Sequence, residues 1–352
     1  MSRGRWAVVL VLAFLVACAP APPARDPLAA YLDDLVAREQ FRGAVEVRRG
    51  DEVLLSQGYD RASPDRRNGV DTRFRIASIT KQFTGFAILL LRDDGKLAVT
   101  DSVCAHLPDC PSAWQPITIE HLLTHTAGLA NYSTFDDVAA ERFFARIGTR
   151  EPSPDQLISA FVDAPLEFQP GSRWVYGNSA YVLLGRIVEL RSGTSYAEFL
   201  RRRVFEPLGM ADTGYQPGAP AGDRYARSYV DWTHPLSYEY TPAVFFASGG
   251  MYSTVTDLVR WQRFLLTGSP AIGPNADLLA PRVPANAVEE YGYGIHAHGS
   301  GDEQTFYHSG LLAGVATYLE IRPSDQLSVV VLSNLDDVDA KGIGRELMSL
   351  AG

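Results

Sequence analysis

Alternating apolar and polar residues predict β-strands close to both ends of the chain. Residues 43–49 and 53–59 alternate on either side of Gly50-Asp51, which is a hairpin signal. Four further short segments toward the C-terminal end show strand patterns: 291–297, 305–307, 315–321 and 327–332. Strands at both ends with helical patterns between them predict one antiparallel sheet assembled from the two termini.

A strongly apolar helix is predicted immediately after Ser78. Residues 79–91 place apolar side chains on all sides of this helix, so we expect it to be buried. It should end at residues 93–95, where Gly95 suits the left-handed residue that closes many helices. Ser78 is therefore expected at the N-terminus of a central, buried helix.

The remaining patterns divide the chain into two intimately joined parts. Amphipathic helices are predicted at about 28–39 and 338–350. We expect an α/β part formed by about 28–96 and 289–352, interrupted by a largely helical part at about 97–288. The predicted fold class is α+β, an antiparallel sheet built from both termini and flanked by helices, with a largely helical inserted subdomain.

The first seventeen residues have the features of an export signal. Arg3 and Arg5 precede twelve residues without a charge, a stretch too short to span a membrane as a helix. Residues 15–18 (Leu-Val-Ala-Cys) resemble a bacterial lipobox, in which the cysteine becomes the lipidated first residue after cleavage. We therefore predict a lipoprotein signal peptide at 1–17 and lipidation of Cys18. An ordinary secreted protein in which Cys18 is incidental is the alternative.

A proline-rich segment separates the predicted anchor from the folded domain. Residues 18–27 include four prolines, a composition that favours an extended, semi-rigid tether ahead of a domain at 28–352. We expect an exported protein that is lipid-anchored to the bacterial cell membrane, on the periplasmic face of the outer membrane.

Composition and charge narrow the possible functions. The 352 residues are 46% apolar and 21% charged, which is enough for a sizeable core. The formal charge is −9, and loss of Arg3 and Arg5 with the signal takes it to −11. An acidic surface repels phosphate backbones, so nucleic acid is not an expected partner. We expect a small-molecule or peptide substrate and no cofactor or metal; the oligomeric state stays open.

The two remaining cysteines, Cys104 and Cys110, are six residues apart around a turn. Export to an oxidising compartment would allow them to form a disulfide. A zinc corner that adds His106 is the competing interpretation, but three ligands within seven residues lack a fourth. We predict the disulfide.

Ser78 and Lys81 form the first candidate for catalytic chemistry. Residues at i and i+3 of a helix lie on one face, so the Lys81 amine can reach the Ser78 hydroxyl. A serine hydroxyl is a poor nucleophile until a base removes its proton, and a desolvated lysine with a lowered pKa can do so. The alternative is that Ser78 only caps the helix and Lys81 is solvated.

Three separate blocks make the chain resemble the class C β-lactamase and penicillin-binding-protein family of serine hydrolases. They occur in the family's order, and two supporting blocks match its scaffold segments. The three are 74–84, which contains Ser78-Ile79-Thr80-Lys81; 170–181, which contains Tyr176 and Asn178; and 308–310, His-Ser-Gly; the supporting blocks are 122–129 and 248–254. The resemblance covers nearly all of the mature chain and implies the family's fold and an acyl-enzyme mechanism.

The resemblance assigns a role to each matching residue. Ser78 would be the nucleophile, and Lys81 and Tyr176 the groups that exchange its proton, with the choice of base between them open. A phenol has a pKa near 10, so Tyr176 acts as a base only if a nearby cation lowers that value. Asn178 would orient Lys81 and the substrate, and the backbone N–H groups of Ser78 and Leu311 would form the oxyanion hole. Packing of Tyr176 and helix capping by Asn178 are the alternatives.

His308 and Gly310 complete the predicted substrate-binding set. Many β-lactamases carry lysine where this chain has His308, and histidine titrates near 6.5 while lysine stays cationic. Recognition of a substrate carboxylate is therefore in doubt, and D-amino-acid peptides, β-lactams and carboxyl esters are all candidate substrates. A non-catalytic envelope lipoprotein that binds penicillin or muropeptides is the alternative function.

Two further pairs of histidines give only weak indications of a functional site. His121 and His125 have metal-ligand spacing on a predicted helix, but no third ligand is evident, so a metal-dependent hydrolase is the least favoured hypothesis. His296 and His298 would share one face of a strand without further site features. The sequence has no Gly-x-Ser-x-Gly, which excludes the nucleophile elbow of α/β-hydrolases.

Overall fold

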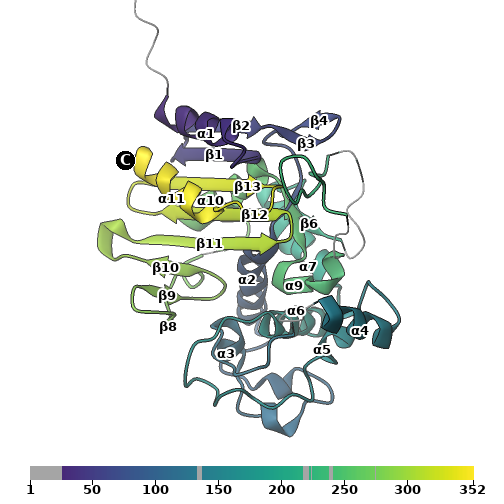
Figure 1. Cartoon of the computed structure of the whole chain (residues 1–352). Helices are drawn as coiled ribbons and strands as arrows, with labels where there is room; N and C mark the ends of the chain where they lie inside the picture. Colours follow the sequence, from purple (N-terminus) through teal and green to yellow (C-terminus); the bar gives the residue numbers. More distant parts are fainter. Residues whose placement is uncertain (1–25, 133–136, 217–221, 223, 238–240, 274) are drawn as a thin grey trace, which may run out of the picture.

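A computed structural model of the chain describes residues 26–132, 137–216, 222, 224–237, 241–273 and 275–352. Eight strands form one antiparallel sheet in the order β2-β1-β13-β12-β11-β10-β9-β8. The N-terminal hairpin therefore lies beside the last strand of the chain, and both ends build the sheet (Figure 1). The predicted α+β fold class is confirmed.

The sheet strands have clear bounds. They are β1 (Gly43–Arg49), β2 (Glu52–Tyr59), β8 (Val283–Pro284), β9 (Glu289–Tyr291), β10 (His296–His298), β11 (Thr305–Leu312), β12 (Val315–Arg322) and β13 (Leu327–Ser333). One prediction here was wrong, because residues 291–297 are two strands joined by a turn. A Cβ on Gly294, whose φ is +93°, would lie 2.4 Å from the Lys81 carbonyl oxygen, so the glycine lets this turn pack against the nucleophile helix.

Helices cover both faces of the sheet. On one face, α1 (Pro27–Ala37) and α11 (Ala340–Leu350) pack against Val329 and Val331 of β13. On the other, α2 (Thr80–Asp93) and α10 (Val255–Thr267) share a core with Val330 and Leu332. Burial on both faces explains why β13 is a continuous apolar run.

The middle of the chain is largely helical, and α2 connects it to the sheet (Figure 1). Its helices are α3 (Ile119–Leu123), α4 (Asp137–Ile147), α5 (Pro154–Ile158), α6 (Ser179–Ser192), α7 (Tyr196–Leu200), α8 (Glu206–Leu208) and α9 (Phe246–Gly249). Smaller sheets pair β3 (Arg61–Ser63) with β4 (Arg66–Arg67), and β5 (Phe74–Arg75) with β7 (Met251–Ser253) and β6 (Gly214–Tyr215).

The two expected parts interlock more than their residue ranges suggest. Both β8 and α10 come from the segment 97–288, yet β8 is a strand of the large sheet and α10 packs on β13 and β1. At the other end, α1 already begins at Pro27, inside the expected tether, and the Asp26 side chain caps it by accepting from the Leu28 N–H at 3.1 Å. Among the described residues, no helix is both long and apolar enough to cross a membrane.

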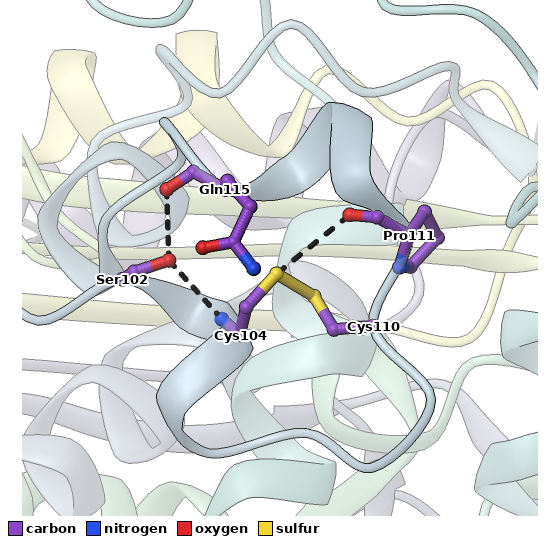
Figure 2. Close-up of a disulfide and its surroundings, with 5 residues drawn as sticks. All are labelled: Ser102, Cys104, Cys110, Pro111 and Gln115. Atoms are coloured by element: carbon purple, nitrogen blue, oxygen red, sulfur yellow. Dashed lines mark hydrogen bonds between the residues drawn. A yellow bond between two sulfur atoms is a disulfide. The ribbon is translucent and has the colours of Figure 1, made fainter.

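Cys104 and Cys110 form a disulfide, as predicted (Figure 2). The Ser102 hydroxyl accepts from the Cys104 N–H at 3.3 Å and donates to the Gln115 carbonyl at 2.8 Å, which fixes the start of the loop. With both sulfurs in the bond, no thiolate is left for a zinc corner. His106 instead places Nε2 2.9 Å from an Asp101 carboxylate oxygen.

Removal of this bridge is expected to lower stability modestly. The closed loop is short, so the double variant Cys104→Ala/Cys110→Ala should lose about 2 kcal/mol of unfolding free energy. Urea denaturation followed by circular dichroism measures the change. Dithiothreitol should destabilise the wild type by a similar amount and leave the double variant unaffected; equal stability of all four samples would contradict the prediction.

Candidate active site

Ser78 lies in the one-turn 3₁₀ segment η1 (Ala77–Ile79), directly ahead of α2. Ala77 before it has φ +46°, an uncommon conformation for a residue with a side chain. The Ile76 N–H donates to the Met251 carbonyl at 3.0 Å, which ties this strained turn to β7. The N-cap of α2 is Ile79, so Ser78 does not cap the helix, and its half-buried hydroxyl is left for another role.

Lys81 occupies the first turn of α2 and is completely buried. Its Nζ lies 2.7 Å from Asn178 Oδ1, 2.7 Å from the Ser248 carbonyl oxygen and 3.1 Å from Ser78 Oγ. Burial holds the pKa of Lys81 well below its usual value, which favours the neutral amine. The first two partners can only accept in this contact, so they take both N–H groups of that amine, and its lone pair is left for the Ser78 hydroxyl.

Asn178 is held by both its backbone and its side chain. It is the residue before α6, but its side chain makes no capping hydrogen bond and turns to Lys81 instead. Its N–H donates to Asn131 Oδ1 at 3.0 Å. The structure therefore favours the orienting role over the capping alternative.

Tyr176 reaches the nucleophile from the loop ahead of α6. Its phenol is hydrogen-bonded to Ser78, and its ring centroid lies 4.8 Å from Lys81 Nζ. The enclosed surroundings raise the pKa of Tyr176 above its usual value, and no cation reverses this. A cation that lowers the pKa of Tyr176, the condition under which it could serve as the base, is not among the groups that act on this phenol.

Gly310 brings β11 against the nucleophile turn. A Cβ at this position would lie 2.4 Å from Thr317 Oγ1, 2.6 Å from the Ile76 carbonyl oxygen and 2.9 Å from Ala77 Cβ. Only glycine allows this approach. Because β10 pairs with β11 no further than Tyr307, the edge of β11 beyond that point is open.

The register of the β11–β12 hairpin orients the Leu311 N–H. Leu312 pairs with Val315 across a two-residue turn, so it forms the hydrogen-bonded pair that closes the hairpin. Such pairs alternate with non-bonded ones along an antiparallel ladder, so Leu311, opposite Ala316, directs its N–H to the open edge. The Leu311 N–H is therefore not used in the β11–β12 ladder, as an oxyanion-hole donor requires.

Comparison with known proteins accounts for this arrangement. The family model described as Beta-lactamase matches residues 28–351. The chain belongs to the beta-lactamase family. Penicillin-binding protein 4* of Bacillus subtilis is 30% identical over 335 residues, covering 89% of this chain and 72% of its own length. Other curated relatives, at 26% identity, are longer, and this chain spans 58% of their length.

Solved structures agree with this beta-lactamase-family fold. The crystal structure of a penicillin-binding protein from Bacillus halodurans superposes with a TM-score of 0.79 at 27% identity, covering 92% of this chain and 99% of that one. A D-amino acid amidase from Ochrobactrum anthropi SV3 gives a TM-score of 0.77 at 23% identity, with coverage of 92% and 97%. The second likeness establishes the shared fold alone.

His308, a histidine that would titrate near 6.5 in water, is buried in the structure. It is 2% exposed, with Nδ1 2.6 Å from the Ser309 carbonyl oxygen and Nε2 3.2 Å from Tyr291 Oη. Burial, with His296 and Lys81 nearby, holds the pKa of His308 well below 6.5. In this beta-lactamase-family site the residue is therefore neutral, with both ring nitrogens occupied.

His125 and Tyr291 are site residues that the sequence reasoning missed. The helix α3 ends at Leu123, so the prediction that His121 and His125 share a helix face was wrong. His125, with φ +58°, points its ring to within 4.4 Å of the Tyr176 ring, while His121 hydrogen-bonds the Thr118 N–H. Among the described residues no group of three or more potential ligands could hold a metal ion.

The two histidines of β10 have different surroundings. His296 stacks on Tyr307 with ring centroids 4.9 Å apart and lies 5.4 Å from the His308 ring, so it belongs to the wall of the site. His298 is near the Val288 carbonyl, away from these rings. The signal that could have found His125 was the block 122–129, which matched the family without a role for its histidine.

Proposed function

We propose that the protein is a serine hydrolase that forms an acyl-enzyme on Ser78 with Lys81 as the general base. The observation that carries the proposal is the Lys81 amine, whose two acceptor contacts leave its lone pair for the Ser78 hydroxyl. A buried lysine with a lowered pKa is matched to this task, because a protonated amine could not accept the proton.

Acylation then follows from the arrangement of the groups. Ser78 Oγ attacks the substrate carbonyl as its proton passes to Lys81 Nζ, and the N–H groups of Ser78 and Leu311 stabilise the tetrahedral oxyanion. The oxyanion collapses and expels the leaving group, which takes the phenol proton of Tyr176. Tyr176 recovers a proton from Lys81. A water molecule repeats the sequence on the acyl-enzyme and restores Ser78.

The candidate substrates differ in charge, and the environment of His308 favours an uncharged one. Penicillins and peptides ending in D-amino acids carry a free carboxylate, which a cation at this position would bind. His308 is neutral and buried, and both ring nitrogens are engaged. We therefore place neutral carboxyl esters and amides ahead of β-lactams and free peptides.

Export and lipid anchoring form part of the proposal. Residues 1–25, with Cys18, lie outside the described residues, and sequence alone supports lipidation there. The described chain enters the fold at α1, on the sheet face opposite η1 and α2.

A non-catalytic penicillin- or muropeptide-binding protein is the second candidate, and acylation chemistry separates the two. The purified protein and Ser78→Ala are treated with a fluorophosphonate and, separately, with a penicillin, and their intact masses are measured. We expect the fluorophosphonate to add one adduct to the wild type alone. A penicilloyl adduct that persists for hours would favour the binding function.

The substrate preference is checked with the same protein. We expect faster turnover of methyl 4-acetoxybenzoate than of 4-acetoxybenzoate, by about tenfold or more after correction for their rates in hydroxide, because only the second carries a carboxylate (about 1.4 kcal/mol per tenfold). Absence of any fluorophosphonate adduct on folded protein would overturn the acyl-enzyme proposal, and equal rates would overturn the charge preference.

A further inference from the structure

Three buried side chains from separate segments are joined beside the nucleophile. His125 follows α3, Tyr291 ends β9 and His308 lies in β11. All three are at most 2% exposed, and Tyr291 Oη is 3.2 Å from Nε2 of each histidine. Two imidazoles thus share one phenol in the interior.

The outer nitrogen of each histidine fixes where its proton lies. The Gly177 N–H points at His125 Nδ1 at 3.4 Å, so Nδ1 accepts and Nε2 carries the proton of the neutral ring. At the other end, His308 Nδ1 lies 2.6 Å from the Ser309 carbonyl oxygen, which can only accept, so here Nδ1 carries the proton. Burial keeps both rings neutral by lowering the pKa of each histidine.

These proton positions give the hydrogen bonds one direction, from His125 through Tyr291 to His308. His125 Nε2–H donates to Tyr291 Oη, and the Tyr291 hydroxyl donates to the bare Nε2 of His308. Tyr181 Oη competes with His308 as an acceptor for the Tyr291 proton, because the Tyr181 proton itself goes to the Leu123 carbonyl at 2.8 Å. The imidazole nitrogen of His308 is a stronger acceptor than a phenol oxygen, so it takes the Tyr291 proton.

The two terminal side chains of this hydrogen-bond chain, His125 and His308, lie on opposite sides of the site. Gly177, bound by His125, lies between Tyr176 and Asn178, and the Val175 N–H donates to the His125 carbonyl at 3.0 Å. His308 lies on β11 three residues before Leu311. The hydrogen bonds therefore run from the Tyr176 loop to the oxyanion edge through Tyr291.

We propose that His125, Tyr291 and His308 form a directed hydrogen-bond chain that positions the Tyr176 loop relative to the oxyanion edge of β11. Its catalytic consequence rests on the proposed serine hydrolase function, while its hydrogen-bond pattern does not. All three are positioning residues, since Lys81, Tyr176 and the backbone N–H groups carry the chemistry. A misplacement of about 1 Å can cost on the order of 100-fold in rate.

The proton positions are measured directly by ¹H–¹⁵N correlation spectra of the full-length protein labelled on histidine. We expect the Nδ1–H tautomer for His308 and the Nε2–H tautomer for His125. Resonances are assigned with His308→Gln and His125→Gln. An Nε2–H tautomer at His308, or a protonated imidazolium at either residue at pH 7, would overturn the proposed hydrogen-bond chain.

The positioning role is measured with Tyr291→Phe, which removes the hydroxyl and keeps the ring. We expect kcat for a neutral ester to fall about 10- to 100-fold with KM little changed. Tyr293→Phe is the matched control, because this buried tyrosine two residues along donates to Glu120 at 2.8 Å instead. An unchanged kcat in Tyr291→Phe, or an equal loss in Tyr293→Phe, would refute the positioning role.

Failure of the serine hydrolase proposal can be distinguished from failure of the hydrogen-bond chain. If the fluorophosphonate does not label the wild type, the serine hydrolase proposal fails, while the tautomers still test the hydrogen-bond chain. If circular dichroism shows that Tyr291→Phe does not fold, the histidine tautomers of the wild-type protein test the hydrogen-bond chain instead.

Discussion

Lys81→Met is expected to lower kcat/KM for a neutral ester by about 1,000- to 10,000-fold, nearly as much as Ser78→Ala. Methionine fills a similar volume but has no lone pair that can take the Ser78 proton. The three oxygens now within 3.1 Å of Nζ also lose their common partner. Without the amine, Ser78 is an ordinary alcohol at the end of a helix.

The double variant tests whether the two residues act as one unit. Ser78→Ala/Lys81→Met should be no slower than Ser78→Ala alone, because a base without its nucleophile contributes little. Lys341→Met is the control for replacing a lysine by methionine, since that amine, on α11, binds Glu289 of β9 and Tyr307 of β11. Near-normal activity of Lys81→Met would assign the proton transfer to another group.

The pH dependence separates Lys81 from Tyr176 as the base. Only the neutral amine accepts a proton, so wild-type kcat/KM should fall as pH drops through the lowered pKa of Lys81. The raised pKa of Tyr176 means that no phenolate forms in the neutral range. The residual activity of Lys81→Met should lack this dependence, and a rise that survives the substitution would point to a different base.

The parts that the sequence predicts well depend on local patterns. Alternation placed the hairpin at β1 and β2, and the all-apolar run after Ser78 predicted a buried central helix. The spacing of Ser78 and Lys81 sufficed to bring hydroxyl and amine together, because three residues in a helical turn fix their separation. The main error, a single strand at 291–297, arose where glycines break an alternating pattern to reach α2.

Contacts between distant segments could not be read from local patterns. Tyr176, Asn178 and Gly310 were found through family resemblance, because nothing in their own neighbourhoods places them beside Ser78. The charge of His308 required knowledge of its burial, which lowers the pKa of an imidazole that would titrate near 6.5 in water. His125 was assigned to a helix that ends two residues earlier, so its contact with Tyr291 was missed.

Gly310→Ala is expected to reduce kcat about 100- to 1,000-fold, with KM affected far less. The new Cβ would lie within 3 Å of Thr317 Oγ1, the Ile76 carbonyl oxygen and Ala77 Cβ. None of these can yield easily, since Thr317 Oγ1 itself donates to the Ile76 carbonyl at 3.1 Å. The open edge of β11 must therefore move away from Ser78 and take the Leu311 N–H with it, and loss of one oxyanion donor costs about this much.

Gly249→Ala separates this effect from the general cost of adding a methyl group. Gly249 also approaches the nucleophile turn, from α9, but a Cβ there would lie 3.6 Å from the Ala77 carbonyl carbon and 3.4 Å from Phe245 Cβ, which are ordinary contacts. Steady-state kinetics and fluorophosphonate labelling rates of both variants give the comparison. Near wild-type rates in both would show that β11 does not supply the oxyanion donor. Slow labelling in Gly310→Ala alone would tie the Leu311 N–H to the transition state, because this reagent also forms an oxyanion when Ser78 attacks it.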